Sequence, residues 1–334
     1  VGASKTATAA VLGGAGLIAT TSGASAAGNS CTSLVVDGGG KYECKTSRPT
    51  TSELKGTGSR LEVFIRNTGE ESEGPAPSFE TTSGDAFLLL DNYGPEFITF
   101  VDETTDGATI TGADNGIKAK ITKVNGALSI TTTGTTTGNG TGTTNAGIYA
   151  RNSGTSLTIN AATTTGGKNG IFAQNKGTGA LSITTTGKTT GATDGISATN
   201  SRGTDLTINA AETEGGENGI RAKHFGTGAL SITTTGTTTG GTTKDGIYAY
   251  KYEGTDLTIN VTELGAVIGG LHGIKAKHYG TGALSITTTG DTKGNWIFEK
   301  DDEGKIIKDE SNGGTDGDGI FAKNSGTDLT INAA

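Results

Sequence analysis

Two short motifs alternate along most of this chain, and their regular return is the feature that most constrains its fold. The string GTGALSITTTG occurs three times without a change, at residues 177–187, 226–236 and 280–290. A G-I-x-A motif and an L-x-I motif follow one another in strict alternation. The isoleucines of the first motif are Ile117, Ile148, Ile171, Ile196, Ile220, Ile247, Ile274 and Ile320. The leucines of the second are Leu128, Leu157, Leu181, Leu206, Leu230, Leu257, Leu284 and Leu329. Successive leucines from Leu157 are 24, 25 and 24 residues apart, so one unit of the repeat has about 25 residues.

Each motif has the pattern of a β-strand. In ALSITTT the Leu and Ile stand two residues apart with Ser between them, which is typical of a strand buried on one face. Gly, Asn, Asp and Thr flank the motifs and favour turns. A unit this short buries its apolar face only by stacking on the next unit. The sequence therefore predicts an all-β fold, a right-handed parallel β-helix (solenoid) of about 25-residue rungs with an N-terminal cap.

Stacking in register has consequences for individual columns of the predicted β-helix. Ile should lie on Ile and Leu on Leu in the interior. Asn115, Asn169 and Asn218 each precede a G-I pair, so we expect them to contribute to a ladder of side-chain amides.

The chain divides into three predicted regions. Residues 1–27 contain one Lys, a short apolar run and a small-x-small site, which indicates the C-terminal part of a secretory signal peptide; a Gly/Ala linker is the alternative. Residues 28–75 lack a clear repeat and are predicted to cap the open end of the β-helix. The β-helix itself is expected over residues 76–334. Since the sequence contains no Met and stops within a repeat, we expect it to be a piece of a longer protein.

The two cysteines of the chain lie in the predicted cap. Cys31 and Cys44 stand on either side of an Asp-Gly-Gly-Gly turn, and a hairpin would bring their thiols together. We predict a disulfide worth about 3 kcal/mol, with two free thiols as the alternative. A disulfide fits the oxidising compartment that a secretory signal implies.

Charge and motif searches weigh against several function classes. The net charge of -8 argues against a protein that binds nucleic acid through bulk charge. The three histidines lack a metal-binding spacing, GGTDGDG resembles a calcium loop only loosely, and we expect no metal and no cofactor. The aspartates recur at equivalent places of the repeat, which favours a structural role. We therefore predict that the protein is not an enzyme, and keep a polysaccharide-cleaving β-helix with clustered carboxylates as an alternative.

Basic and aromatic residues occupy the outward positions of the G-I-x-A strands. On an acidic protein such a column predicts contact with a host-cell receptor, matrix or anionic glycan; the alternative is an ordinary solvated strand face. The candidate binding face comprises Lys118, Lys120, Tyr149, Arg151, Arg221, Lys223, His224, Tyr248, Tyr250, Lys275, Lys277 and His278.

An insertion breaks the repeat near its end. Residues 291–316 make one unit some 20 residues longer than the others, and they contain NWIFEKDDEGKIIK, which predicts a projecting hairpin. The hairpin holds the single Trp of the chain and is a second candidate contact, through Trp296, Ile297 and Phe298. The alternative is that these side chains pack against the rod.

The signal-like start, the cap with its Cys pair and the rungs rich in Gly, Thr and Asn resemble the passenger domain of a type V autotransporter. The unit NGIYAxNxGTxLTINAA, alternating with GTGALSITTTG, is similar to that of the Bartonella autotransporters over roughly residues 84–334. The resemblance implies a C-terminal outer-membrane β-barrel beyond this sequence, through which alone the protein would meet a membrane. It also implies an exported passenger on or released from a Gram-negative surface. Such a passenger would act as an adhesin or, alternatively, as a proangiogenic agonist of an endothelial growth-factor receptor.

Overall fold

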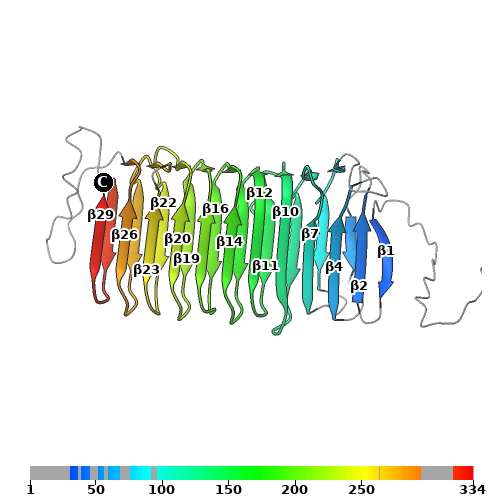
Figure 1. Cartoon of the computed structure of the whole chain (residues 1–334), viewed down its shortest axis with the longest axis horizontal. Helices are drawn as coiled ribbons and strands as arrows, with labels where there is room; N and C mark the ends of the chain where they lie inside the picture. The colour runs from blue at the N-terminus through cyan, green and yellow to red at the C-terminus, as the bar shows by residue number, and fades with distance from the viewer. Residues whose placement is uncertain are drawn as a thin grey trace, which may run out of the picture.

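The repeating units form successive coils of a rod (Figure 1). The computed structural model describes residues 31–36, 39–45, 52–55, 59–67, 76–91, 96–262, 264–294 and 319–333. These residues form an all-β parallel β-solenoid of about 8 turns of roughly 27 residues, and they contain no helix. The predicted fold class is confirmed. No helix within the described ranges is long and apolar enough to cross a membrane.

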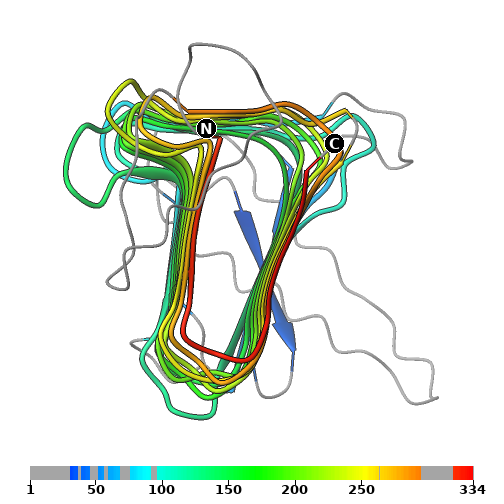
Figure 2. The same cartoon turned by 90° about the vertical axis from the view of Figure 1, so that its left-hand side faces the viewer.

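Three walls enclose the core of the rod (Figure 2). Wall 1 is a ten-stranded sheet made of the G-I-x-A strands and their N-terminal counterparts. Its strands are β3 (Ser52–Lys55), β6 (Phe87–Leu90), β9 (Ile117–Ile121), β11 (Ala146–Asn152), β13 (Asn169–Asn175), β16 (Asp194–Asn200), β19 (Asn218–His224), β22 (Ile247–Lys251), β25 (Ile274–His278) and β28 (Ile320–Asn324).

Walls 2 and 3 belong to one nineteen-stranded sheet, because β10 and β12 bend from one wall to the other. Wall 2 carries the L-x-I strands and their N-terminal counterparts: β2 (Gly39–Cys44), β4 (Arg60–Ile65), β7 (Phe97–Asp102), β10 (Ala127–Gly138), β12 (Leu157–Gly166), β14 (Leu181–Thr185), β17 (Leu206–Ala210), β20 (Leu230–Thr234), β23 (Leu257–Val261), β26 (Leu284–Thr288) and β29 (Leu329–Ala333). Wall 3 carries the short strands β5 (Ser78–Glu80), β8 (Thr109–Gly112), β15 (Thr189–Gly191), β18 (Thr213–Gly215), β21 (Thr238–Thr239), β24 (Val267–Ile268) and β27 (Thr292–Lys293).

The hand of the coil follows from the end-on view. In Figure 2 the C-terminal end faces the viewer, and the last coil runs down β28 and then up β29. This path is anticlockwise for a chain that advances towards the viewer, which makes the solenoid right-handed. Right-handed crossovers are the rule for parallel strands, because twisted strands pack back onto their sheet most readily in that way.

The strands pair in the register that the repeat predicts. On wall 1, Ile148 pairs with Ile171 and Ile171 with Ile196, and on wall 2, Leu157 pairs with Leu181. These side chains are fully buried and belong to one continuous core cluster. The same string therefore recurs in the sequence because it occupies the same place in successive coils.

The N-terminal end closes with a hairpin. β1 (Cys31–Val36) pairs antiparallel with β2, and Cys31 lies opposite Cys44 with 4.0 Å between their Cα atoms. The predicted Cys31–Cys44 disulfide is present. Strands β2, β3 and β4 lie within residues 28–75, where we expected a cap, and each already pairs in parallel with a strand of the next coil. Residues 1–27, and nearly all of the hairpin predicted at 291–316, lie outside the described residues.

A mixed column of acids and amides lines the corner before wall 1. The Asn115 side-chain nitrogen donates to Asp85 Oδ1 at 2.6 Å, and Asn218 donates to Asp194 Oδ1 at 2.8 Å. Asn169 lies between Ala146 and Asp194 in the register. We expected Asn115, Asn169 and Asn218 to contribute to a ladder of side-chain amides. They do not stack on one another, because Ala146 and Asp194 occupy the intervening coils.

Candidate binding face

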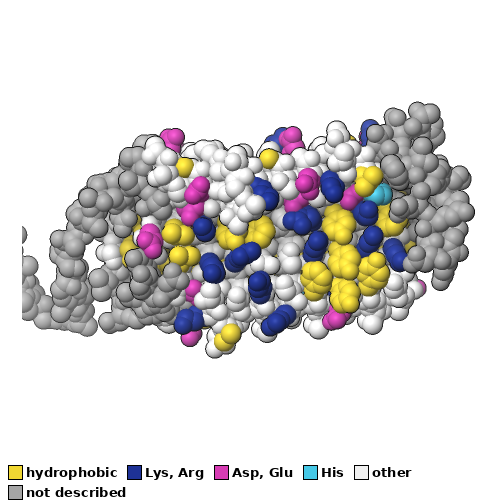
Figure 3. Space-filling view, turned by 180° about the vertical axis from the view of Figure 1, so that it is seen from behind, with side chains coloured by type: hydrophobic (Ala, Val, Ile, Leu, Met, Phe, Trp, Pro, Cys, Tyr) yellow, Lys and Arg dark blue, Asp and Glu magenta, His cyan; other side chains and the backbone are white. Residues whose placement is uncertain are grey.

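The outward side chains of wall 1 from β9 to β28 form what we call the basic face. Strand alternation points the Ile and Ala of each G-I-x-A motif inward and the two residues between and after them outward. Lys and Arg fill half of these outward positions, the others are aromatic or uncharged, and none is Asp or Glu. The basic residues are Lys118, Lys120, Arg151, Arg221, Lys223, Lys275, Lys277 and Lys323. Figure 3 shows Lys and Arg side chains spread along the rod on this side.

The N-terminal half of the basic face is partly neutralised or covered. Lys118 Nζ lies 3.6 Å from Asp85 Oδ2. The rings of Tyr149 and Phe172 stack with 4.9 Å between centroids, and the Arg151 guanidinium lies 5.4 Å above the Tyr149 ring. Tyr149 is consequently buried, although it occupies an outward position. These contacts leave less of this half available to a partner.

A cluster of aromatic rings dominates the C-terminal half. We call Phe225, Tyr250, Tyr252 and Tyr279 the aromatic corner. The centroid of Tyr250 lies 5.8 Å from that of Phe225 and 5.6 Å from that of Tyr279, so the rings form one continuous patch. Hydrophobic side chains gather at the corresponding place in Figure 3, with Lys and Arg around them.

Basic side chains border the aromatic corner on several coils. Lys223 Nζ lies 5.9 Å from the centre of the Tyr248 ring, and Lys323 Nζ lies 5.8 Å from that of Tyr279. Lys277 Nζ lies 5.7 Å from the centre of the Phe321 ring. Arg221 is different, because its Nε donates to the buried Asp194 carboxylate at 2.7 Å. Cation–π contacts hold the lysines near the rings while their ammonium groups keep their charge.

His224 and His278 do not belong to this face. They are fully buried and pair in register with Lys251, which lies between them and is buried as well. We call the column that contains them the inner ladder: Asn152, Asn175, Asn200, His224, Lys251, His278 and Asn324. Expecting the two histidines on the binding face was therefore wrong, since strand alternation from Ile220 and Ile274 turns both inward.

Asparagine suits the inner ladder because its side-chain amide forms hydrogen bonds with backbone groups of the turn that follows wall 1. The Asn152 side-chain nitrogen donates to the Ser156 carbonyl at 2.8 Å and to Asn175 Oδ1 at 3.3 Å. The Gly154 amide donates to Asn152 Oδ1 at 3.0 Å. This is the stacked amide ladder that we had expected on the other corner.

In three consecutive coils the inner ladder contains a basic residue in place of Asn, namely His224, Lys251 and His278. Lys251 Nζ donates to the Gly226 carbonyl at 3.1 Å and to the Glu253 carbonyl. Burial lowers the pKa of Lys251 to about 8. Burial and the neighbouring Lys251 charge lower the pKa of His224 as well. These coils therefore bury a basic stack where the neighbouring coils bury neutral amides.

The aromatic corner lies next to the basic stack in sequence and in space. Phe225, Tyr252 and Tyr279 directly follow His224, Lys251 and His278. Sequence reasoning missed these three rings and Lys251. Aligning the position after the inner ladder would have found the rings, because other coils have Ser153, Lys176, Ser201 and Ser325 there.

The buried carboxylate of Asp102 accepts hydrogen bonds that stabilise a turn. Asp102 accepts hydrogen bonds from the Thr104 hydroxyl at 2.6 Å and from the Ala108 amide at 2.9 Å. Although burial raises its pKa, these and other hydrogen bonds hold the pKa of Asp102 below its usual value. Within the described part of the chain, no cluster of His, Cys, Asp and Glu could hold a metal ion.

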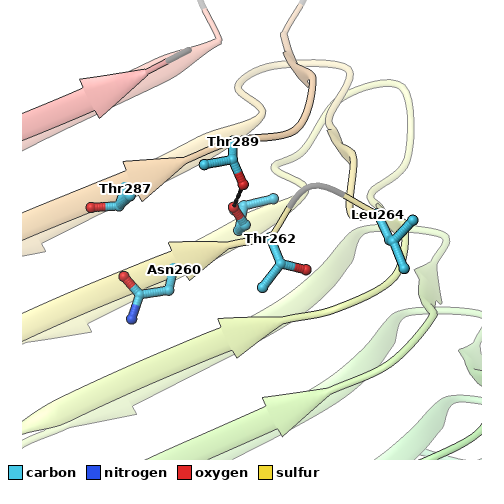
Figure 4. A pocket seen from close by; sticks show the side chains of 6 residues that line it. Asn260, Thr262, Leu264, Thr287 and Thr289 are labelled. Atoms are coloured by element: carbon cyan, nitrogen blue, oxygen red, sulfur yellow. Dashed lines mark hydrogen bonds between the residues drawn. The ribbon is translucent and has the colours of Figure 1, made fainter.

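A shallow depression lies on wall 2 between β23 and β26 (Figure 4). Its lining comprises Asn260, Val261, Thr262, Leu264, Thr287 and Thr289. The Thr289 hydroxyl donates to the Val261 carbonyl at 3.1 Å, and the Leu264 side chain is 88% exposed. None of these six residues is ionisable, so the depression offers hydroxyl and amide groups but no acid or base.

The remaining predicted contact, Trp296, Ile297 and Phe298, lies outside the described residues. Comparison with protein-family models, with curated proteins and with solved structures finds no match. The chain is a β-solenoid domain of about 8 turns.

Proposed function

We propose that this rod is a non-enzymatic, exported binding module that attaches to anionic glycans at a host-cell surface through its basic face. The observation that carries the proposal is the charge asymmetry of wall 1. Half of its outward positions from β9 to β28 are Lys or Arg and none is acidic, although the whole chain has a net charge of -8. A row of like charges along one face attracts an extended polyanion and increases its rate of association.

The architecture supports a binding role. Equivalent side chains recur at each coil, about 4.8 Å apart, so a polymer that lies along the rod meets the same kind of group repeatedly. The buried carboxylates described above accept hydrogen bonds within a turn, as Asp102 does from Thr104, or between neighbouring coils, as Asp85 does from Asn115. Export to a cell surface, by an autotransporter route, is suggested by the resemblance of the repeat to autotransporter passengers.

The test measures affinity for a heparin-derived decasaccharide over a range of salt concentrations. Changing Lys223, Lys275 and Lys277 to Gln should weaken binding by about tenfold or more and flatten its dependence on salt. The control changes Lys188 and Lys293 to Gln. Lys188 directly precedes β15 of wall 3 and pairs with Glu214 at 2.7 Å, and Lys293 lies in β27 of wall 3 and pairs with Asp291 at 3.1 Å. Equal effects of both variants, or no binding by the unaltered protein, would count against the proposal.

A further inference from the structure

The aromatic corner is a local departure from the repeat, which sets it apart from the structural columns of the rod. Three consecutive coils place Phe225, Tyr252 and Tyr279 at a position where Ser or Lys stands in the four other coils compared above. Coil geometry alone does not require these rings, because Ser153 and Ser201 occupy the same position beside strands that pair in the same register.

The rings are open to solvent. The exposed fractions of Phe225, Tyr252 and Tyr279 are 36%, 49% and 36%, which places them among the most exposed large hydrophobic residues of the described chain. Tyr250 and Tyr252 are nearly parallel, with 12° between their planes and 6.4 Å between centroids. Exposed apolar side chains gathered into one patch mark a surface that contacts something.

The chemistry of the patch combines flat apolar faces with phenol hydroxyls and cations. Tyrosine offers a ring face for apolar contact and a hydroxyl for hydrogen bonding. Lys223 and Lys277 extend from the strands on either side of β22, which carries Tyr250. A ligand that fits must present a flat apolar face, hydroxyl groups and negative charge at close intervals.

We propose that the aromatic corner is the subsite at which an anionic oligosaccharide is held by ring stacking. One or two pyranose rings lie with their C–H faces on Tyr250 and Tyr252, and their sulfate or carboxylate groups reach Lys223 and Lys277. This inference rests on the proposed function and deepens it, since it names sulfated or uronic-acid sugars as the ligand class. A polyanion without sugar rings would use the lysines alone.

The experiment compares two probes, a heparin-derived decasaccharide and an inorganic polyphosphate of similar charge. Changing both Tyr250 and Tyr252 to Ala should weaken decasaccharide binding about tenfold, while polyphosphate binding should stay within about twofold. Tyr252→Phe alone keeps the ring and should retain most of the decasaccharide affinity. Phe97→Ala is the matched control, because Phe97 is 39% exposed on wall 2. Far-UV circular dichroism and thermal melting establish that each variant is folded.

The outcomes separate this inference from the proposed function. Selective loss of decasaccharide binding in the Tyr250/Tyr252 double variant, with affinity retained in the single variant Tyr252→Phe, supports the stacking site. If the folded double variant binds the decasaccharide as tightly as the unaltered protein does, the stacking site is refuted. That result leaves the lysine-dependent polyanion site of the proposed function intact. If neither probe binds the unaltered protein, the proposed function and the stacking site both fail.

Discussion

Lys251 and Tyr252 are neighbours in the sequence and face opposite sides of the rod wall. The Lys251 side chain is fully buried in the inner ladder, with its Nζ 3.1 Å from the Gly226 carbonyl oxygen. Tyr252 is about half exposed and contacts Phe225 and Tyr250. The buried basic stack and the exposed aromatic corner are thus two sides of the same three coils.

Replacing Lys251 with Asn should stabilise the rod. Asn occupies the equivalent position of other coils and there satisfies the turn without a buried charge. We expect the free energy of unfolding to rise by about 1–3 kcal/mol at pH 7, from relief of desolvation. Denaturant unfolding followed by circular dichroism measures the change, with Lys277→Asn on the outer side of the same wall as the control.

The increase in the free energy of unfolding that Lys251→Asn causes should depend on pH. In the folded state the pKa of Lys251 is about 8, below its usual value, so between pH 8 and pH 10.5 the unfolded state binds a proton that the folded state does not. Wild-type stability therefore gains from this group as the pH rises through that window. The advantage of the variant should be complete below pH 8 and vanish towards pH 10.5. A pH-independent difference would show that charge burial is not its cause.

His224 should make the rod sensitive to acid. Its folded pKa is lowered by burial and by Lys251, so below about pH 6.5 the unfolded state binds a proton that the folded state excludes. Stability from this group is undiminished above pH 6.5 and falls as the pH drops. The melting temperatures of wild type and His224→Asn should be compared at pH 7.5 and pH 5. Wild type should lose more of its melting temperature than the variant between pH 7.5 and pH 5, so the difference between the two proteins should be larger at pH 5. An unchanged difference at the two pH values would refute this.

The isoleucine stack should be the main source of stability along wall 1. Ile196 is fully buried between Ile171 and Ile220. Ile196→Ala should lower the free energy of unfolding by about 2–5 kcal/mol, because it removes apolar burial and leaves a cavity. Thr199→Ala, on the outer side of the same strand, should change it by less than about 0.5 kcal/mol. Comparable losses from both changes would contradict the assigned core.

The Cys31–Cys44 disulfide should stabilise the N-terminal end alone. Replacing both cysteines with Ala should cost about 3 kcal/mol locally, through the greater freedom of the unfolded hairpin. Each coil contacts only its neighbours, so hydrogen exchange should accelerate in β1, β2 and β4. Exchange in β16 and β19 should not change. Uniform acceleration along the rod would mean that the coils unfold as one unit.

Strand alternation was sufficient to predict most of the core, and it also exposes our error with the histidines. From Ile220, alternation places Ala222 and His224 on the same inner side. The predicted binding face nevertheless included His224 and its equivalent in the repeat, His278. Burial of such a residue depends on turn carbonyls from neighbouring coils, such as the Thr255 carbonyl 2.6 Å from His278 Nε2. Those partners are distant in sequence, so periodicity alone does not reveal them.

Sequence reasoning missed two other features for different reasons. Phe225, Tyr252 and Tyr279 stand in turns, where aligning the repeats reveals the aromatic position but the period of two no longer assigns its side chain to a face. Strand β4 lies in a region without a visible repeat, yet it pairs in parallel with β7. Its apolar residues alternate, with Leu61, Val63 and Ile65 buried, and backbone pairing requires no identity of sequence.

Lysine acetylation with and without a bound heparin-derived decasaccharide tests the central claim most directly. Mass spectrometry of the modified protein reports which ammonium groups the ligand covers. We expect protection of Lys223, Lys275 and Lys277 on the basic face, with Lys188 before β15 and Lys293 on wall 3 modified as in the free protein. Protection that is equal on both walls, or confined to wall 3, would contradict it.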